Sequence, residues 1–470
     1  MKRHQLILLA GAFFSASTLA APTVYLPLGI DSHLETQLDR MFALTYGTPM
    51  HKPYALAEVD NALRLLKGRD ITLYRYLTNE LKRYRGDDKI SRYGARTTFD
   101  SGESSKIANQ RGLTSEEYGQ LFFEGVWRPN DNVLTQIGVD YRLNAKELVA
   151  YHSTVSMAMG NLQLDIGYRD HWYSNFKNAS QVLSNNAKSP LSMTLSTIIP
   201  IKNWWNLDFE LFYTKLDEVK SGIRYQDEWH DGRPELIGMH GSIELFEGWQ
   251  VGFNRVMQFG GGPRDTDLGD IFKAIFNPAA YDNSSSDLSR DEEFGDQMMS
   301  ITSSFNFHWQ MPIELYFEYG AEDTNDHSNF KFGNESLAMG IYLPQLSSNS
   351  ALRYEVNKWN TSWYVNYNYK FGNTNEGFVF GHYGADDRRF GDGVPSTVHS
   401  INYDYFSSPT NSWQLALNTQ QNDRSEYQRA YAVSLKNSRK IQNYRLETTL
   451  SGGKDAFDED YAHIAVTVLW

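Results

Sequence analysis

The sequence predicts an all-β transmembrane barrel of about 18 antiparallel strands, with a small N-terminal α-helical bundle that plugs the periplasmic end. Three observations predict this fold. Residues 1–20 have the pattern of a secretory signal. Residues 21–89 carry helical periodicity, and in residues 90–470 the hydrophobic period falls to two. We therefore expect a signal peptide, a helical plug and a barrel, in that order.

The N-terminal segment reads as a targeting signal. It begins with Lys2 and Arg3, continues with an apolar core from Leu6 to Phe14, and ends in small residues at Ala20. The alternative is a buried first helix. We expect cleavage after Ala20, which places the mature chain outside the cytoplasm.

Three amphipathic helices are expected in residues 31–86. Ser32, with Glu35 three positions later, fits a capping box for the first helix. Gly68 closes the second helix, and Asp70 caps the third. Three short helices bury too little apolar surface to be stable alone. We therefore expect them to pack on the barrel and to cover its lumen.

Strict alternation of apolar and polar residues defines the predicted strands. In residues 205–214, Trp205 and Tyr213 bracket an apolar middle, which is typical of the aromatic girdles of outer-membrane barrels. In the last strand, apolar residues occupy every second position from Ala462 to the C-terminal Trp470. A closing strand of a bacterial outer-membrane barrel has this pattern.

Chain length sets the strand count. Strands of ~10 residues with their connections take about 20 residues each, which gives about 18 strands. We expect both termini in the periplasm. Arg255 breaks the pattern, because it falls on the lipid-facing parity, where it snorkels to an interface or marks a bulge. Short turns expected to face the periplasm are 129–131, 200–203, 247–248 and 309–312, and long stretches expected to face outward are 173–190, 218–233, 260–292 and 359–394.

Composition excludes several classes of function. The net charge of −13 argues against nucleic-acid binding through a basic surface, and the absence of Cys excludes disulfides and thiolate chemistry. No hydrolase or phosphate-loop motif is present, and the 12 His show no pair at metal-ligand spacing. The acidic runs 291–296 and 455–460 fit either solvated loops or a structural cation. We therefore expect no enzyme, no cofactor and no metal.

The predicted outward loops have a composition that suits sugars. Aromatic faces stack on sugar rings, amides bond hydroxyls, and guanidinium groups pair with carboxylates. The alternative is that these aromatic residues form the girdle or pack the loops. The candidate glycan-binding residues are Trp172, Tyr173, Trp229, Arg233, Arg264, Trp359, Trp363, Tyr367, Tyr369, His382, Asp386, Arg388 and Arg389.

Four short segments occur in an order that resembles a known family. They are residues 170–173, 254–261, 319–323 and 381–386, and the last fits a G-H-x-x-G-x-D pattern. Their order resembles that of the capsule-assembly Wzi family of outer-membrane proteins. Tyr173 departs from that family, which tends to have Trp at this position.

The resemblance implies an 18-stranded barrel closed from the periplasm by helices. It also implies a lectin-like protein that binds capsular or extracellular polysaccharide at the cell surface. We expect a monomer in contact with outer-membrane lipid. A channel for export or uptake of polar solutes or oligosaccharides is the alternative function, and a barrel-embedded hydrolase or lipid-modifying enzyme is a third.

Overall fold

The structure is a computed structural model. It describes residues 21–470 apart from positions 87, 103–104, 278–288, 326–327 and 390. The predicted signal peptide, residues 1–20, lies outside the described residues. Among the described helices, none is long and apolar enough to cross a membrane.

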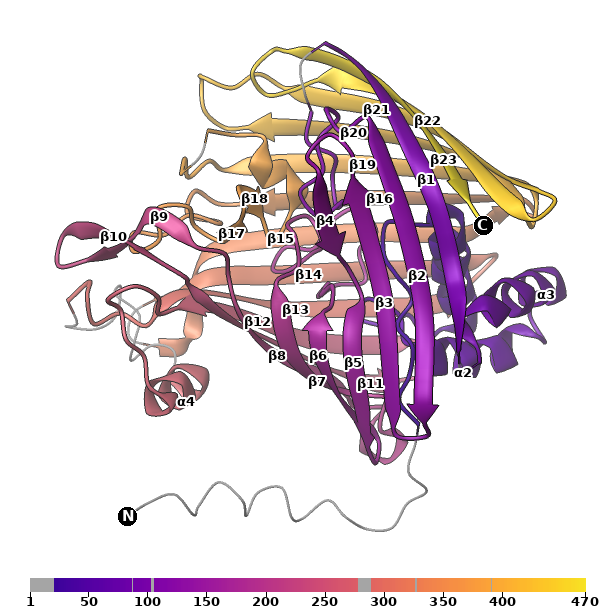
Figure 1. Cartoon of the computed structure of the whole chain (residues 1–470), viewed down its shortest axis with the longest axis horizontal. Coiled ribbons are helices and arrows are strands. Elements are labelled where there is room, and N and C mark those ends of the chain that lie inside the picture. Colours follow the sequence, from indigo (N-terminus) through magenta and orange to yellow (C-terminus); the bar gives the residue numbers. More distant parts are fainter. Residues whose placement is uncertain (1–20, 87, 103–104, 278–288, 326–327, 390) are drawn as a thin grey trace.

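Eighteen antiparallel strands form a closed barrel, as the sequence predicted (Figure 1). The first and last strands close it: Gly94 pairs with Leu469, and Gly102 pairs with Tyr461. β4 and β5 both pair with β3 and together make one strand of the wall. The strands are β1 (Asp88–Gly102), β2 (Gly119–Asn130), β3 (Val133–Arg142), β4 (Glu147–Ala150), β5 (Ser153–Met159), β6 (Leu162–Tyr168), β7 (Leu191–Thr197), β8 (Asp208–Lys215), β11 (Glu235–Phe246), β12 (Trp249–Phe259), β13 (Gly295–His308), β14 (Pro312–Asn325), β15 (Ser328–Ser347), β16 (Ser350–Trp359), β19 (Ser396–Ser408), β20 (Asn411–Asn422), β21 (Ala430–Ile441), β22 (Tyr444–Lys454) and β23 (Asp460–Leu469).

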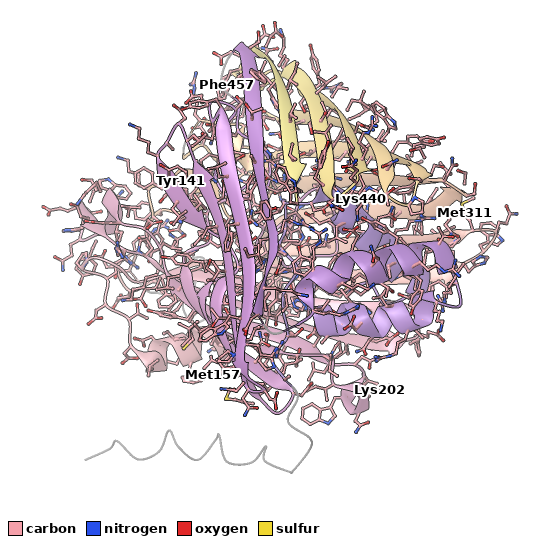
Figure 2. All side chains as sticks on the ribbon, turned by 45° about the vertical axis from the view of Figure 1, so that its right-hand side comes forward. Tyr141, Met157, Lys202, Met311, Lys440 and Phe457 are labelled. Atoms are coloured by element: carbon pink, nitrogen blue, oxygen red, sulfur yellow. The ribbon has the colours of Figure 1, made fainter. Side chains whose placement is uncertain are left out.

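The two ends of the barrel differ. At one end, the short-turn end, hairpins such as 247–248 and 309–311 join the strands, whereas the long connections lie at the other, the long-loop end. Figure 2 shows Lys202 and Met311, from two short connections, on the side where the N-terminal helices lie. The long connections contain two small hairpins and two short helices: β9 (Val219–Tyr225), β10 (Glu228–Gly232), β17 (Thr374–Asn375), β18 (Phe378–Val379), α4 (Leu268–Phe276) and η4 (Tyr383–Asp386).

Along each strand, successive side chains point alternately to the outside and to the lumen of the barrel. On the outer face, Phe253, Ile301 and Phe317 are 45%, 46% and 43% exposed, whereas their inward neighbours Asn254 and Glu318 are fully buried. Since the exposed row is apolar, it forms the lipid-facing belt. The predicted strand at 205–214 needs one correction.

Trp205 lies in a turn and not in a strand. Its φ of 53° is left-handed, and β8 begins only at Asp208. Leu207 donates its N–H to Trp204 O across that turn, at 2.9 Å. The alternating pattern therefore runs past the true start of the strand.

The three predicted helices are present as α1 (Ser32–Thr45), α2 (Leu56–Leu66) and α3 (Ile71–Glu80). Asp70 caps α3 as expected, because its carboxylate accepts from Thr72 N and Leu73 N. The predicted cap of α1 is corrected by one residue. Asp31, with extended backbone, accepts from Leu34 N at 2.9 Å, whereas the Ser32 hydroxyl donates to Glu447 of β22. The helix thus begins where the better acceptor stands.

The helices pack against the inner wall of the barrel at the short-turn end. The core of the head, which includes Leu38 and Phe42, is continuous with Val126 and Leu134 of β2 and β3. The imidazole of His33 bonds Ser412 Oγ at 2.7 Å, at the start of β20. A head too small to be stable alone therefore shares its core with the wall.

The lumen is filled from both ends. The connection between β6 and β7, residues 169–190, folds inward from the long-loop end and meets residues 46–55 of the head. Lys52 N donates to Trp172 O at 2.9 Å, and Trp172 N donates back to Lys52 O at 3.0 Å. A cavity of about 460 Å³ remains beside β20–β23, with Arg96, Lys436 and Glu447 among its lining residues.

Four segments converge on one buried carboxylate, that of Asp39 in α1. It accepts a hydrogen bond from Tyr54 Oη at 2.7 Å and lies 3.2 Å from Lys177 Nζ, 3.7 Å from Arg353 Nη2 and 3.9 Å from Lys52 Nζ. We call these five residues the Asp39 cluster. Burial opposes ionisation of Asp39, but the cations of Lys177, Lys52 and Arg353 outweigh it and hold its pKa well below the usual range. The carboxylate is therefore charged at neutral pH.

Asp39→Asn should destabilise the closed barrel, because it leaves the buried Lys52 and Arg353 and the half-buried Lys177 without their shared anion. Breaking a buried ion pair costs about 3–5 kcal/mol. The control is Asp60→Asn, whose half-exposed pair with Arg85 should contribute less than about 1 kcal/mol. Urea unfolding in detergent micelles measures both, and equal small losses would contradict the role of Asp39.

Candidate functional site

Most of the aromatic residues predicted to bind glycan are buried. A ring without an exposed face cannot stack on a sugar, so these side chains pack the loops. Trp229 and Tyr367 remain 40% exposed, and Arg233 and Arg389 are also exposed. The predicted site residues that are buried are Trp172, Tyr173, Arg264, Trp359, Trp363, Tyr369 and His382, and those that are half-buried are Asp386 and Arg388.

The buried predicted residues hold the connection 360–395 in shape. His382 Nδ1 accepts from Gly384 N at 3.0 Å, and burial lowers the pKa of His382 to about 3, so the ring is neutral. Asp386 accepts from Val379 N at 3.0 Å and from Asn186 Nδ2 at 2.6 Å. These contacts tie the connection to itself and to residues 169–190.

Two predicted arginines also act within the loops. Arg388 donates to Trp363 O at 3.0 Å. Arg264 donates to Glu293 O at 2.6 Å, to Arg224 O at 3.2 Å and to Arg290 O at 3.4 Å. Arg264 therefore fixes the backbone at Arg224 and at Arg290, which come from different connections.

A cluster of rings and cations, exposed apart from the half-buried Arg224, lies next to these backbone contacts. We call Arg224, Trp229, Arg290, Tyr367 and Lys370 the aromatic–basic surface. Arg224 Cζ lies 4.3 Å from the centroid of the Tyr367 ring and 5.7 Å from that of Trp229. Arg290 Cζ lies 4.4 Å from the Tyr367 ring, and Lys370 Nζ lies 6.0 Å from the Trp229 ring. Three separate connections supply these residues at the long-loop end.

Local backbone pairing brings the surface together. Arg224 and Trp229 face each other across the β9–β10 hairpin. Arg224 N donates to Asn368 O at 2.9 Å, which places the hairpin beside Tyr367. The sequence prediction found Trp229 and Tyr367 but missed Arg224, Arg290 and Lys370. Cross-strand pairing in the predicted stretch 218–233 is the signal that could have found Arg224.

The surface offers the two contacts that an acidic sugar needs. A pyranose ring stacks on an aromatic face, and a carboxylate pairs with guanidinium or ammonium groups. Asp227 accepts from Arg224 Nη2 at 2.8 Å, and Glu293 lies 3.7 Å from Arg290 Nη1. The Arg224–Asp227 pair is weak because Asp227 is exposed, so a glycan carboxylate can displace it, whereas the Glu293 carboxylate beside Arg290 is buried.

The structure also brings together a group that the sequence did not predict. Among the described residues, His51, Asp208 and His240 have ligand atoms within 4.8 Å of one another, as a metal site would require. His51 Nδ1 lies 3.2 Å from Asp208 Oδ2. His240 bonds Asn254 Oδ1 at 2.6 Å and Ser242 Oγ at 3.2 Å. These contacts make the group a polar link between the head and the wall.

Neither predicted acidic run forms such a group among the described residues. Lys454 pairs with Asp458 at 2.7 Å and with Asp460 at 3.7 Å. Asp455 Oδ1 accepts backbone N–H groups of its own turn, and Asp291 Oδ1 accepts from Gln226 N at 2.9 Å. The carboxylates thus have partners from the protein itself.

The link through His51 should depend on pH. Burial disfavours the charged ring, but Asp208 opposes this and the pKa of His51 is raised to about 9. The link therefore stabilises the protein fully below the unfolded pKa of about 6.5. Its contribution is lost as the pH rises through about 9. The unfolding free-energy difference between the natural chain and His51→Gln should shrink between about pH 7 and pH 10.

His33→Gln is the matched control for that measurement. Burial lowers the pKa of His33 to about 4, so this ring is already neutral at pH 7. The difference in unfolding free energy between His33→Gln and the natural chain should stay constant over the same pH range. A His51→Gln difference that is also constant would contradict a charged His51.

Comparisons with known proteins agree with this architecture. The family model described as capsule assembly protein Wzi matches residues 92–451. No curated protein sequence matches the chain. The solved structure of Wzi from Escherichia coli, described as a carbohydrate-binding β-barrel involved in group 1 capsule assembly, is 13% identical, with a TM-score of 0.71, over 96% of this chain and 99% of that one.

A second structure, OccAB4 of Acinetobacter baumannii, is 8% identical, with a TM-score of 0.48, over 83% of this chain and 98% of that one. The likeness to Wzi shows a shared fold. Since the family model covers more than half of the chain, this outer-membrane barrel belongs to the capsule assembly protein Wzi family.

Proposed function

We propose that this protein binds an acidic capsular or extracellular polysaccharide and holds it at the cell surface, without acting as an enzyme. The aromatic–basic surface is the observation that carries the proposal. It combines two exposed rings with three cations, although the whole chain is acidic at −13. Local charge, and not net charge, governs attraction at such a surface.

The proposal requires the long-loop end to face the outside. Outer-membrane barrels have short periplasmic turns and longer extracellular loops. The helical head then plugs the periplasmic end, and both termini lie in the periplasm. The aromatic–basic surface stands at the opposite end, where exported glycan is present.

Binding of one repeat unit is expected to be weak. The surface is open, and two of its cations already have acidic partners, Arg224 in the exposed Asp227 and Arg290 in the buried Glu293. A long glycan repeats its unit, however, and many barrels share one membrane. Multivalent contact raises the overall affinity without any new contact in a single site, which suits retention of a polymer.

The filled lumen bears on the alternative function, a channel. The Lys52–Trp172 bridge and the Asp39 cluster join the head, the connection 169–190 and the barrel wall inside the lumen. We expect the full-length protein to show no steady conductance in a planar bilayer. The Asp39→Asn variant, with a loosened lumen, should show more frequent openings. Steady conductance of the natural chain would favour the channel.

Charge removal tests the glycan-binding surface directly. The change is Arg224→Gln, Arg290→Gln and Lys370→Gln together, which keeps both rings. Loss of three charge contacts at about 0.2–1 kcal/mol each weakens the affinity for an acidic polysaccharide by roughly 3- to 150-fold. Biolayer interferometry on purified barrels at low salt measures the affinity.

The control is Arg424→Gln with Arg429→Gln, two exposed arginines of the β20–β21 connection at the same end, which are not among the predicted glycan-binding residues. It should bind as the natural chain does. The loss should be smaller for a neutral polysaccharide and at high salt, because salt screens exposed charges. Equal affinity of the triple variant and the natural chain would contradict the assigned surface.

A further inference from the structure

The lipid-facing row of β12 contains one charged residue with an unusual role. Phe253 on this row is 45% exposed, but Arg255 and Met257, farther toward the long-loop end, are buried although they point away from the lumen. Helix α4 covers them. Arg255 Nη1 donates to Ile275 O at 2.8 Å, and Nη2 donates to Ala274 O at 2.8 Å. Figure 1 shows α4 outside the strand wall.

Arg255 therefore fastens the helix to the outside of the barrel. The carbonyls at the C-terminal end of a helix have no partner within it. A guanidinium supplies donors there and complements the negative end of the helix dipole. Ile271, Ala274 and Ile275 complete the attachment by packing on Met257, Phe259 and their neighbours. Arg255, the charged residue that broke the predicted lipid-facing pattern, is thus the residue that attaches α4 to the barrel.

A second apolar stripe on α4 has no protein against it among the described residues. Leu268, Phe272 and Phe276 recur every four residues and are 64%, 60% and 78% exposed. At about 100° per residue they lie to one side of the barrel-facing residues. Asp270 and Lys273 occupy the remaining side, and Lys273 Nζ lies 3.4 Å from Asp270 Oδ1. The helix thus has a barrel side, an apolar side and a polar side.

The level of α4 on the barrel indicates what covers the apolar stripe. Met239 pairs with Arg255 on one side and with Leu211 on the other, so the three share one row. Leu211 is a lipid-facing residue that is 42% exposed, and Phe253 lies two residues nearer the short-turn end. The C-terminal end of α4, which Arg255 bonds, therefore lies at the level of the apolar belt, and the contacts of the helix with Met257 and Phe259 extend toward the long-loop end.

We propose that α4 is an interfacial membrane helix, whose residues Leu268, Phe272 and Phe276 enter the acyl-chain boundary of the outer leaflet beside the barrel. A helix with one apolar and one charged side lies in the plane of such an interface. The barrel supplies the lateral support, and the lipid covers the stripe. This role would set the depth of the barrel in the membrane, and it does not depend on glycan binding.

The absence of cysteine makes the test direct. Phe272→Cys and Phe276→Cys, each in the full-length chain, accept a single environment-sensitive fluorophore. Asp227→Cys is the control, because its side chain is 85% exposed in the β9–β10 turn. The proteins are reconstituted in phosphatidylcholine–phosphatidylglycerol vesicles with and without doxyl-labelled acyl chains. We expect blue-shifted emission and strong doxyl quenching at 272 and 276, and neither at 227.

Two results would overturn the proposal. One is emission and quenching at 272 and 276 equal to those at 227, which would place the stripe in water. The other is blue-shifted emission without doxyl quenching, in which the blue shift increases with protein density. This result would show that a second copy covers the stripe. Arg255→Ala in the labelled chains should reduce quenching while heat-modifiable migration of the barrel persists. Unchanged quenching would contradict attachment through Arg255.

Discussion

The buried carboxylate of Asp39 holds together the parts of this protein that a wide barrel would otherwise leave apart. An 18-stranded wall encloses more space than its own inward side chains fill. Here α1 supplies the anion, residues 46–55 supply Lys52 and Tyr54, the inward-folded connection supplies Lys177, and β16 supplies Arg353. A single charge thereby joins the head, the inner loop and the wall.

This arrangement explains how the long-loop end keeps its shape. The connection 169–190 is held inside the barrel by the head, and it in turn supports the connection 360–395 through contacts such as Asn186 with Asp386. Buried rings such as Trp359 and Trp363 then fill the space between connections. Only after this packing do Trp229 and Tyr367 remain at the surface. The packing of the loops and the exposed part of the aromatic–basic surface therefore use the same aromatic residue types, buried in one case and exposed in the other.

Periodicity predicted the elements well and their partners poorly. The three helices and the closing strand at Trp470 follow from local patterns that the fold preserves. Trp205 was misplaced because its parity continues that of β8 through a left-handed turn residue. Composition could not separate Trp363, which packs a loop, from Tyr367, which faces solvent, because sugar stacking and loop packing favour the same rings.

The groups assembled from distant positions were beyond prediction from one sequence. Arg224, Arg290 and Lys370 come from three connections, and His51 meets Asp208 and His240 only when the head enters the lumen. Arg255 is the instructive case. Its parity marked it as anomalous, but only the fold shows the helix carbonyls that it bonds. The break in the alternating pattern thus marked the position of a contact but did not show which groups Arg255 bonds.

Retention of glycan at the cell surface is the central claim, and fractionation of a deletion strain tests it most directly. Polysaccharide bound to cells and polysaccharide free in the medium are quantified with and without the gene. We predict an unchanged total with a shift from the cells into the medium, reversed by the natural gene in trans. A collapse of the total, which would indicate export, or no change in either fraction would contradict the account.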